Sequence, residues 1–355
     1  MSLSDWRPLD RLGSIRTKLS ILVAGAVTIS VLIGSVGYRI GWPFWFRLIT
    51  SVLVGLGIMR LVAAGITSPL REMAAAARAM ADGDYSTEVR ATSRDEVGEL
   101  ANAFNEMSAE LAEVDRQRRD LVANASHELR TPIAALQAMI ENLADGVSTA
   151  DPDYVETMHQ QVRRLATLVD QLLSLSRLDS GEMPLHGETV SVAALINASV
   201  DEFGWHHPDV KVEIDVQPET LLFTVDQMLM HRVVANLLEN AVRHGAPPFR
   251  VAASMSAGRD GTPIITLTVS DHGPGIPPDA ASQVFDRFHR LDRSRRSGGS
   301  GLGLAIVAGI VERHHGIIGV EPNEPSGARM VVRIPQDFRD ATTGTFSRRS
   351  PQPVL

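Results

Sequence analysis

From Leu19 to Tyr38 the sequence carries no charged side chain, a run of 20 residues. A helix rises about 1.5 Å per residue, so this run would span roughly 30 Å, the thickness of the apolar core of a bilayer. It is also longer than the apolar part of a usual secretion signal. We therefore expect a membrane-spanning helix, with a buried helix of a soluble protein as the alternative.

A second apolar stretch, residues 44–66, contains Arg47 and Arg60. Each arginine lies near one end of the stretch, where its long side chain can reach the membrane interface. Basic residues precede the first stretch, which places the N-terminus in the cytoplasm by the positive-inside rule. We expect a multi-pass protein of the cell membrane, in contact with lipids, with two spans and both termini cytoplasmic. Here too a buried soluble helix is the alternative.

Two short heptad runs follow, at residues 70–80 and 97–114. Pro69 is well placed to open the first helix, and an extended connector is expected around Val89. Two helices and a connector just after a membrane span resemble the HAMP signal-relay module. Pro69 and the string DEVGEL, residues 95–100, match the pattern of that family. An ordinary helical hairpin is the alternative.

Two longer amphipathic stretches come next. One has an apolar stripe from Val122 to Leu143, and the other has a stripe from Val155 to Leu178. One such hairpin cannot bury both stripes by itself, whereas two hairpins in a four-helix bundle can. We therefore infer a homodimer.

Beyond residue 181 the pattern changes to α+β. Strand-like runs appear at residues 210–216 and 264–269, and helical patterns at 225–243 and 302–313. The polar tail beyond Pro335 is expected to be disordered. The net charge of -8 argues against a general nucleic-acid binder. The absence of cysteine excludes disulfides and thiol nucleophiles, and the paired histidines form no metal-ligand set.

The string SHELRTP, residues 126–132, carries the first candidate chemistry. His127 falls off the apolar stripe, so it should be exposed. A neutral imidazole is a good nucleophile near pH 7, and Glu128 can accept its proton. Thr131 lies one turn further on the same face. Pro132 should bend the helix beside the histidine.

A pair of amides marks the second candidate site. Asn236 and Asn240 are four residues apart on one face of the expected helix. Their oxygens can share Mg²⁺ with phosphate oxygens. Arg243 lies on nearly the same face and can contact phosphate, and His244 follows it. Alone, such an asparagine pair is usually ordinary surface polarity.

Asp271 opens the string DHGPGIP directly after a strand. A buried carboxylate can accept a hydrogen bond from the adenine amino group, whereas guanine presents an oxygen there, so the site should prefer ATP. The glycines of the string allow the backbone to approach the ring. A plain turn is the alternative. The string adds Gly273, Gly275 and Ile276 to the site.

A glycine-rich segment, residues 298–303, runs into an apolar helix. Amides at a helix N-terminus bind phosphate, although the segment is not a P-loop. Before it lie Arg287 and Phe288, then a basic loop that could form a lid over the phosphates. A flexible linker and a solvated loop are the alternatives. The expected ligand-binding residues are Gly299, Gly301, Leu302 and Gly303, and the lid arginines are Arg293, Arg295 and Arg296.

These four motifs in this order resemble the catalytic core of the histidine kinases over roughly residues 66–335. The resemblance implies that His127 accepts the γ-phosphoryl group of ATP, that Glu128 assists, and that Asp271 reads adenine. It also implies that Asn240 helps to hold Mg²⁺. An aspartate on a response regulator would then receive the phosphoryl group.

The resemblance further links Thr131 to dephosphorylation of that partner. His244 departs from the pattern, since many relatives carry Tyr or Phe there. One rival function is an ATP-driven clamp of the gyrase or Hsp90 type, which does not need the SHELRTP string. Another is a catalytically silent scaffold, against which the intact Asn240, Asp271 and Gly301 argue.

The implied fold class is multidomain, and its ATP-binding domain is an α/β sandwich of the Bergerat type, shared with gyrase and Hsp90. The expected parts are a cytoplasmic N-terminus (1–18), two transmembrane helices (19–66), a HAMP parallel coiled coil (67–115), a dimeric four-helix bundle for phosphotransfer (116–181), the ATP-binding domain (182–335) and the tail (336–355).

Overall fold

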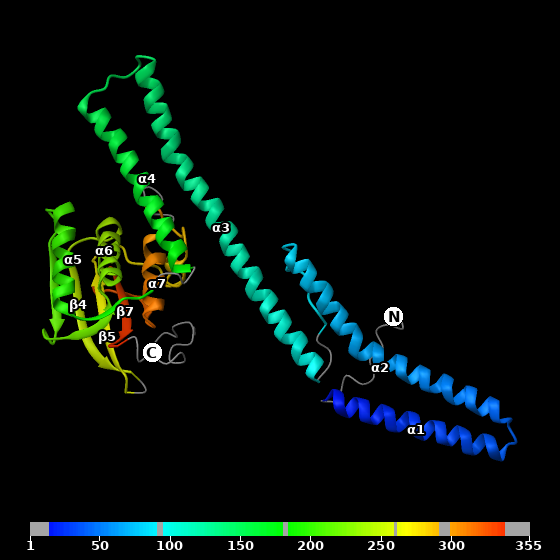
Figure 1. The fold of residues 1–355 in the computed structure, drawn as a ribbon. Coiled ribbons are helices and arrows are strands. Elements are labelled where there is room, and N and C mark those ends of the chain that lie inside the picture. The colour runs from blue at the N-terminus through cyan, green and yellow to red at the C-terminus, as the bar shows by residue number, and fades with distance from the viewer. Residues whose placement is uncertain (1–13, 91–94, 180–183, 259–260, 291–298, 338–355) are drawn as a thin grey trace. The chain divides into compact units, whose positions relative to one another are not determined.

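The computed structural model describes residues 14–90, 95–179, 184–258, 261–290 and 299–337. The expected lid arginines and most of the expected tail lie outside these residues. The chain divides into two compact units, Met1–Asp120 and Leu121–Leu355 (Figure 1). The first holds helices α1 (Ile15–Arg39), α2 (Phe44–Ala81) and the start of α3 (Glu96–Ala144).

The rest of α3 and all later elements belong to the second unit. Its other helices are α4 (Pro152–Asp179), α5 (Val192–His206), α6 (Gln227–His244), the short 3₁₀ helix η2 (Gln283–Phe285) and α7 (Gly303–Arg313). Its strands are β1 (Gly187–Ser191), β2 (Val212–Gln217), β3 (Leu222–Asp226), β4 (Phe249–Ala257), β5 (Pro263–Ser270), β6 (Ile317–Pro322) and β7 (Ala328–Pro335).

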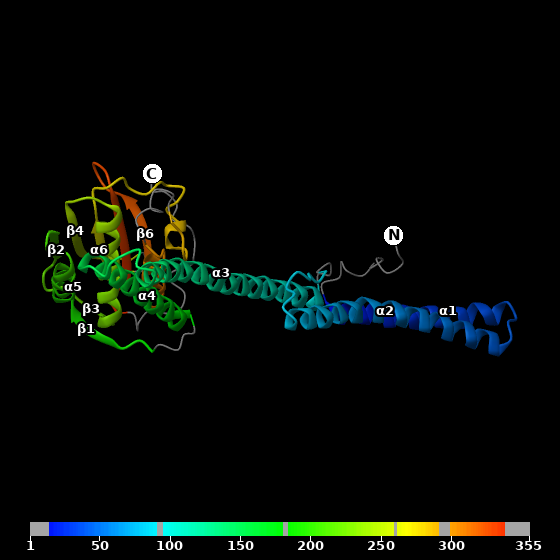
Figure 2. The same ribbon diagram turned by 90° about the horizontal axis from the view of Figure 1, so that it is seen from above.

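Helices α1 and α2 pack side by side in the first unit (Figures 1 and 2). The chain reverses between them at Gly41, which has φ 82, and Trp42 donates its amide to the Gly37 carbonyl at 2.8 Å. A Cβ built on Gly37 would lie 2.9 Å from Cγ of Arg47. The small residue therefore makes room for the arginine stem between the helices.

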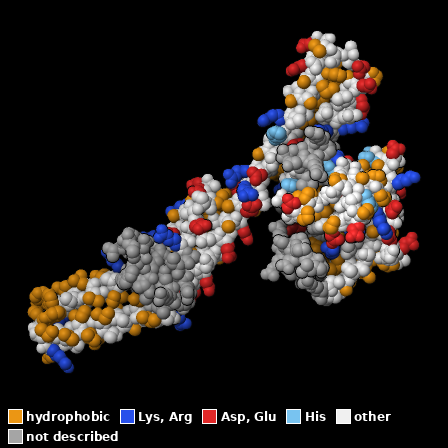
Figure 3. Space-filling model, turned by 180° about the vertical axis from the view of Figure 1, so that it is seen from behind, with side chains coloured by type: hydrophobic (Ala, Val, Ile, Leu, Met, Phe, Trp, Pro, Cys, Tyr) orange, Lys and Arg blue, Asp and Glu red, His pale blue; other side chains and the backbone are white. Residues whose placement is uncertain are grey.

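The surface of this helix pair is apolar, as the orange end of the molecule in Figure 3 shows. Soluble proteins rarely expose so large a contiguous apolar surface. Within the described residues, α1 is long and apolar enough to cross a membrane, and α2 does not meet the same criterion. The first expected span is therefore a membrane-helix candidate, and the second stays a prediction. Exposed apolar side chains include Val31, Leu32, Phe44, Trp45, Leu53 and Met59.

Helix α2 continues through Pro69 to Ala81 as one helix of 38 residues. The expectation that Pro69 opens a separate helix is therefore wrong. Proline already has a helical φ and removes a single backbone hydrogen bond. A long helix with complete turns on both sides can accommodate that loss.

The relay region of the first unit has its own small core. Met73 and Ala76 of α2 pack with Val89 of the connector and with Val97 and Ala101 of α3. The predicted connector around Val89 is present, and its described residues 84–90 are neither helix nor strand. The sequence did not reveal what holds it: the side-chain amide of Asn105 bonds both the N–H and the carbonyl of Val89, at 3.0 and 2.9 Å.

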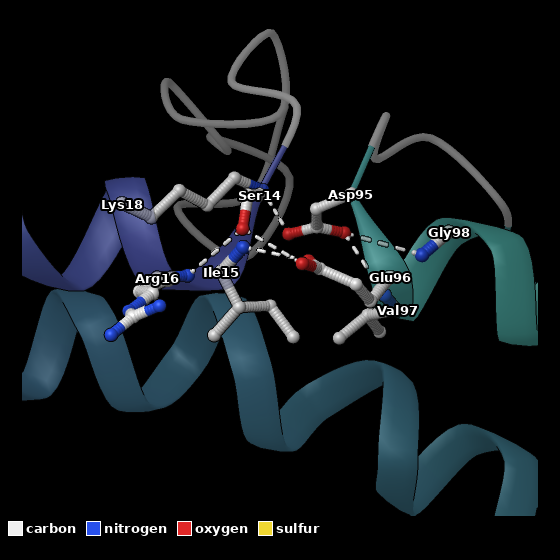
Figure 4. Close-up of polar contacts among 8 residues, drawn as sticks. All are labelled: Ser14, Ile15, Arg16, Lys18, Asp95, Glu96, Val97 and Gly98. Atoms are coloured by element: carbon white, nitrogen blue, oxygen red, sulfur yellow. Dashed lines mark hydrogen bonds and ion pairs between the residues drawn. The ribbon is translucent and has the colours of Figure 1, made fainter.

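A polar cluster ties the start of α1 to the start of α3 (Figure 4). The Lys18 ammonium lies 2.6 Å from the Asp95 carboxylate, and both side chains are buried. The Glu96 carboxylate accepts hydrogen bonds from the Ser14 hydroxyl and the Ile15 amide, each at 2.7 Å. We call these five residues the α1–α3 clasp.

The clasp also begins α3 itself. One carboxylate oxygen of Asp95 accepts hydrogen bonds from the Val97 and Gly98 amides, both at 3.2 Å, and so caps the helix. The hydrogen bond from the Ile15 amide is the largest of several that hold the pKa of Glu96 below its usual value. Two neighbouring acids thus fix α1 to the first turn of α3.

The clasp can be tested by removing its cation. Lys18→Met takes away the ion that Asp95 contacts, and breaking a buried pair costs about 3–5 kcal/mol. We expect faster amide hydrogen exchange over residues 96–101, measured on the whole chain in lipid nanodiscs. The control is Arg71→Met, which removes an exposed cation from α2. Equal exchange in the two variants would show that the clasp does not hold α3.

In the second unit, α3 passes through Pro132 without interruption and ends at Ala144. Asp151 accepts a hydrogen bond from the Tyr154 amide at 2.8 Å and begins α4. The expected pair of long helices is therefore present.

This hairpin leaves much of its apolar surface uncovered in the single chain. Val122, expected to face the core, is 60% exposed. Its neighbour Leu121 packs against the core instead, as does Leu129. The other large exposed apolar residues of the two helices include Ile133, Ile140, Val155, Val162, Val169 and Leu173.

A two-layer α/β domain forms the rest of this unit (Figure 2). Its five-stranded sheet has the order β2-β4-β5-β7-β6, in which only the β2–β4 pair is parallel. Helices α5, α6 and α7 pack on β2, β5 and β6. The strands and helices predicted after residue 181 are confirmed as β2, β5, α6 and α7, whereas β1, α5, β3, β4, β6 and β7 were not predicted.

Candidate active site

Helix α6 presents two free amides at the edge of its buried face. Val233, Leu237 and their neighbours are fully buried under the sheet, which leaves Asn236 and Asn240 half-buried beside them. Neither asparagine side chain makes a hydrogen bond to any other residue that the structure describes. Their oxygens are therefore available to a ligand.

The glycine-rich segment lies against this helix. A Cβ built on Gly303 would stand 3.6 Å from the Asn236 amide oxygen, and one on Gly299 would stand 3.1 Å from a guanidinium nitrogen of Arg243. Gly301 has φ 71, and its carbonyl accepts the Phe288 amide at 3.0 Å. Leu302 is fully buried directly before α7. The segment thus carries backbone amides to the N-terminus of α7, where an anion is favoured.

Asp271 follows β5 and is only 8% exposed. One of its carboxylate oxygens accepts hydrogen bonds from the Gly273 amide at 2.8 Å and the Ala328 amide at 3.4 Å. No hydrogen bond from a described residue reaches the other oxygen. The geometry leaves one oxygen of a buried carboxylate open to a donor on a ligand.

Two glycines that the sequence did not single out make this burial possible. A Cβ on Gly245 would overlap the Asp271 side chain, and one on Gly327 would overlap the Asp271 carbonyl oxygen. Gly327 also has φ 116, which side chains rarely adopt. Asn323, likewise not predicted, donates to that carbonyl at 2.8 Å. The turn after α6 and the turn before β7 therefore close tightly on the aspartate.

Burial is the main cause of the shifted pKa values of Asp271 and His244. It raises the pKa of Asp271, and the amides of Gly273 and Ala328 offset part of that effect. Desolvation also lowers the pKa of His244, and the nearby cations Arg243 and Arg290 lower it further. A neutral imidazole beside the carboxylate can accept or donate a hydrogen bond.

Two of the remaining predicted residues are arginines that pair with acids of the protein itself. Arg287 pairs with Asp179 of α4 at 2.6 Å, and Arg243 pairs with Glu239 at 2.9 Å. Their expected contacts with phosphate stay predictions. Ile276 packs against the core beside the DHGPGIP turn, and a Cβ on Gly275 would lie 2.9 Å from the Gly327 carbonyl.

His127 forms a separate site on α3. Its side chain is exposed, as predicted, and that of Glu128 is half-buried. The Thr131 hydroxyl lies 3.4 Å from the His127 carbonyl, a weak contact that leaves it free to bind elsewhere. The nucleotide motifs lie against one another, whereas no hydrogen bond or ion pair joins His127 to them among the described residues.

Comparison with known proteins agrees with this division of the chain. Residues 61–113 match the HAMP domain, residues 117–181 the His Kinase A (phospho-acceptor) domain, and residues 225–337 the histidine kinase-, DNA gyrase B- and HSP90-like ATPase family. The solved histidine kinase AdeS of Acinetobacter baumannii is 26% identical. It covers 59% of this chain and 98% of its own, with a TM-score of 0.50.

Two curated relatives are similar over most of this chain. The signal transduction histidine-protein kinase BaeS of Escherichia coli is 33% identical over 82% of this chain and 62% of its own length. The histidine-protein kinase/phosphatase MprB of Mycolicibacterium paratuberculosis is 33% identical over 79% of this chain and 55% of its own. The chain thus spans a little over half of the length of these relatives.

Asp271→Asn tests the buried carboxylate. Because the native pKa is raised, ionised Asp271 destabilises the fold at neutral pH, and this effect disappears below the ordinary pKa of aspartate. We expect the variant without nucleotide to unfold at a higher temperature than the wild type near pH 7, with the difference shrinking toward about pH 4. Its affinity for ATP should fall about tenfold or more, because a charge-assisted hydrogen bond is lost.

The control for this variant is Asp279→Asn, an exposed acid of the same loop. Thermal unfolding across pH and calorimetric titration with ATP give both readouts. A variant no more stable than the control, with unchanged ATP affinity, would contradict the role assigned to Asp271.

Proposed function

Because this chain belongs to the sensor histidine kinases of two-component systems, we propose that it transfers the γ-phosphoryl group of ATP to His127 and then to an aspartate of a response regulator. The observation that carries this proposal is the exposed His127 beside the half-buried Glu128 on α3, apart from nucleotide motifs that lie against one another. An ATP-driven clamp would have no use for that pair.

The chemistry needs positioning and charge neutralisation more than covalent help from the protein. A ring nitrogen of His127 attacks the γ-phosphorus, a P–N bond forms, and the bond to the bridging oxygen of ADP breaks. Glu128, the next residue, accepts the proton that the imidazole loses. Its half-buried position favours a fixed carboxylate beside the exposed ring.

The nucleotide site has the donors and acceptors that ATP with Mg²⁺ requires. The free oxygens of Asn236 and Asn240 suit a hard cation shared with phosphate oxygens. The amides around Gly299–Gly303 suit the phosphates, and the open oxygen of Asp271 suits the adenine amino group. Bound Mg²⁺ would neutralise charge on the transferring group.

We also propose that the chain works as a homodimer at the cell membrane. The exposed apolar residues of α3 and α4 suit a second copy in a four-helix bundle. The apolar α1–α2 pair suits two spans in a lipid bilayer, with both termini in the cytoplasm.

His127→Gln tests the phosphorylation step. We expect no label on the protein from γ-labelled ATP, while calorimetry shows unchanged ATP affinity, because no hydrogen bond or ion pair joins His127 to a nucleotide motif among the described residues. The control is His159→Gln, which changes an exposed histidine on α4. Acid-stable label that persists in the His127 variant would mean that a hydroxyl amino acid is the acceptor.

A phosphatase activity toward the regulator follows from Thr131, which shares the His127 face. Its hydroxyl makes only a weak contact, at 3.4 Å, and so can orient a water on a phosphorylated partner. MprB, one of the relatives described above, is named as a kinase/phosphatase.

Thr131→Ala should therefore spare phosphorylation of His127 and slow the release of phosphate from a phosphorylated regulator by about tenfold or more. Thr157→Ala is the matched control, because the Thr157 hydroxyl is already bonded to the Asp153 carbonyl at 2.8 Å. Phosphate release is followed by loss of label from the regulator. If both variants release phosphate at the wild-type rate, Thr131 has no such role.

A further inference from the structure

His314, directly after α7, is fully enclosed. Its Nδ1 lies 2.8 Å from the Ile310 carbonyl, and its Nε2 lies 3.0 Å from the backbone nitrogen of Asp226. A carbonyl can only accept and an amide can only donate. The ring must therefore be neutral, with its proton on Nδ1 and a lone pair on Nε2.

Asp226 joins several elements at this point. It ends β3, and its carboxylate caps α6 by accepting the Leu229 amide at 3.1 Å. The other carboxylate oxygen accepts the His186 amide at 3.0 Å, on the segment that enters the domain after α4. His314 thus connects the end of α7 to the start of α6 and, through Asp226, to the interdomain segment.

Both helices reach from the His314 end to the proposed ATP site. Asn236 is nine residues from the start of α6, about 14 Å along the helix, and Gly303 is eleven residues before His314, about 16 Å away. Helices α6 and α7 pack against each other, and a Cβ built on Gly303 would stand 3.6 Å from the Asn236 amide oxygen. A shift at the His314 end therefore changes the spacing between the amides and the glycine-rich segment.

We propose that His314 is a positioning residue for ATP binding: its hydrogen bond to the Asp226 amide fixes α6 against α7 and so sets the geometry of the nucleotide site. This inference rests on the proposed ATP site. Protonation of Nε2 would bring two N–H groups together, so the link is lost in acid. The site then loses affinity for ATP.

The surroundings oppose protonation of this ring. Desolvation is the main cause that lowers the pKa of His314, and Arg313 and His315 act in the same direction. The Asp226 carboxylate and the bond to Ile310 act the other way. Because the native pKa is lowered, the stabilisation is complete above the ordinary pKa of histidine and declines as the pH falls below it.

The test measures autophosphorylation against ATP concentration, with the full chain in nanodiscs, between about pH 5.5 and 8. His314→Asn keeps a donor for Ile310 but places no acceptor near Asp226. We expect its KM for ATP to rise about tenfold at pH 7.5 with kcat unchanged, as for loss of one buried hydrogen bond. Its KM should also lack the acid-dependent rise that the wild type has. His314→Gln can restore an acceptor at Asp226, so its KM should recover while staying pH-insensitive.

The matched control is His315→Asn, on the exposed next residue, whose φ of 54 asparagine tolerates well. It should retain the wild-type KM at pH 7.5, and the pH at which its KM rises should move only upward, because His315 is one of the groups that lower the pKa of His314. Thermal unfolding of each variant gives the folded fraction. The proposal is overturned if His314→Asn behaves as the control does, or if its KM rises only in step with unfolded protein. Asn240→Ala checks the ATP site separately: unchanged KM there would refute the site assignment itself.

Discussion

The buried carboxylate of Asp271 is the constraint on which the catalytic end of the domain depends. An ionised group away from water is costly unless hydrogen bonds replace the lost solvent. Here the amides of Gly273 and Ala328 supply that replacement on one oxygen only. Tight turns at Gly245 and Gly327 then leave no space for a larger side chain at either position beside it. The cost is a less stable domain without ligand, and the proposed nucleotide would find an open acceptor oxygen there.

Much of the site could be predicted because its chemistry lies in short strings. The exposure of His127 followed from its place off the apolar stripe, and the common face of Asn236 and Asn240 followed from their spacing on α6. Gly245, Gly327 and Asn323 were missed for a physical reason. Gly327 and Asn323 meet Asp271 only after β5 and β7 pair, and Gly245 meets it only after β4 and β5 pair. No local pattern in the sequence predicts a contact between residues so far apart in the chain.

The errors in the fold have similar causes. The preference of proline for a first helical turn is weak against a long helix, and α2 runs through Pro69. The contact of Lys18 with Asp95 joins segments 77 residues apart, so DEVGEL could suggest a relay module but not what its acids bind. Val122 lies on a stripe that a single hairpin covers only in part. Periodicity identifies an apolar face without identifying what covers it.

The uncovered stripe of α3 and α4 has a consequence for inheritance. If each chain buries that stripe against a second copy, a chain with a damaged nucleotide site or a missing His127 still pairs normally, since neither lies on the apolar stripe. In a cell with two alleles, half of the assemblies would then be mixed when both are made equally. A defective allele would then also lower the activity of the normal chains that pair with its product. Two chains with different defects could complement each other within one dimer.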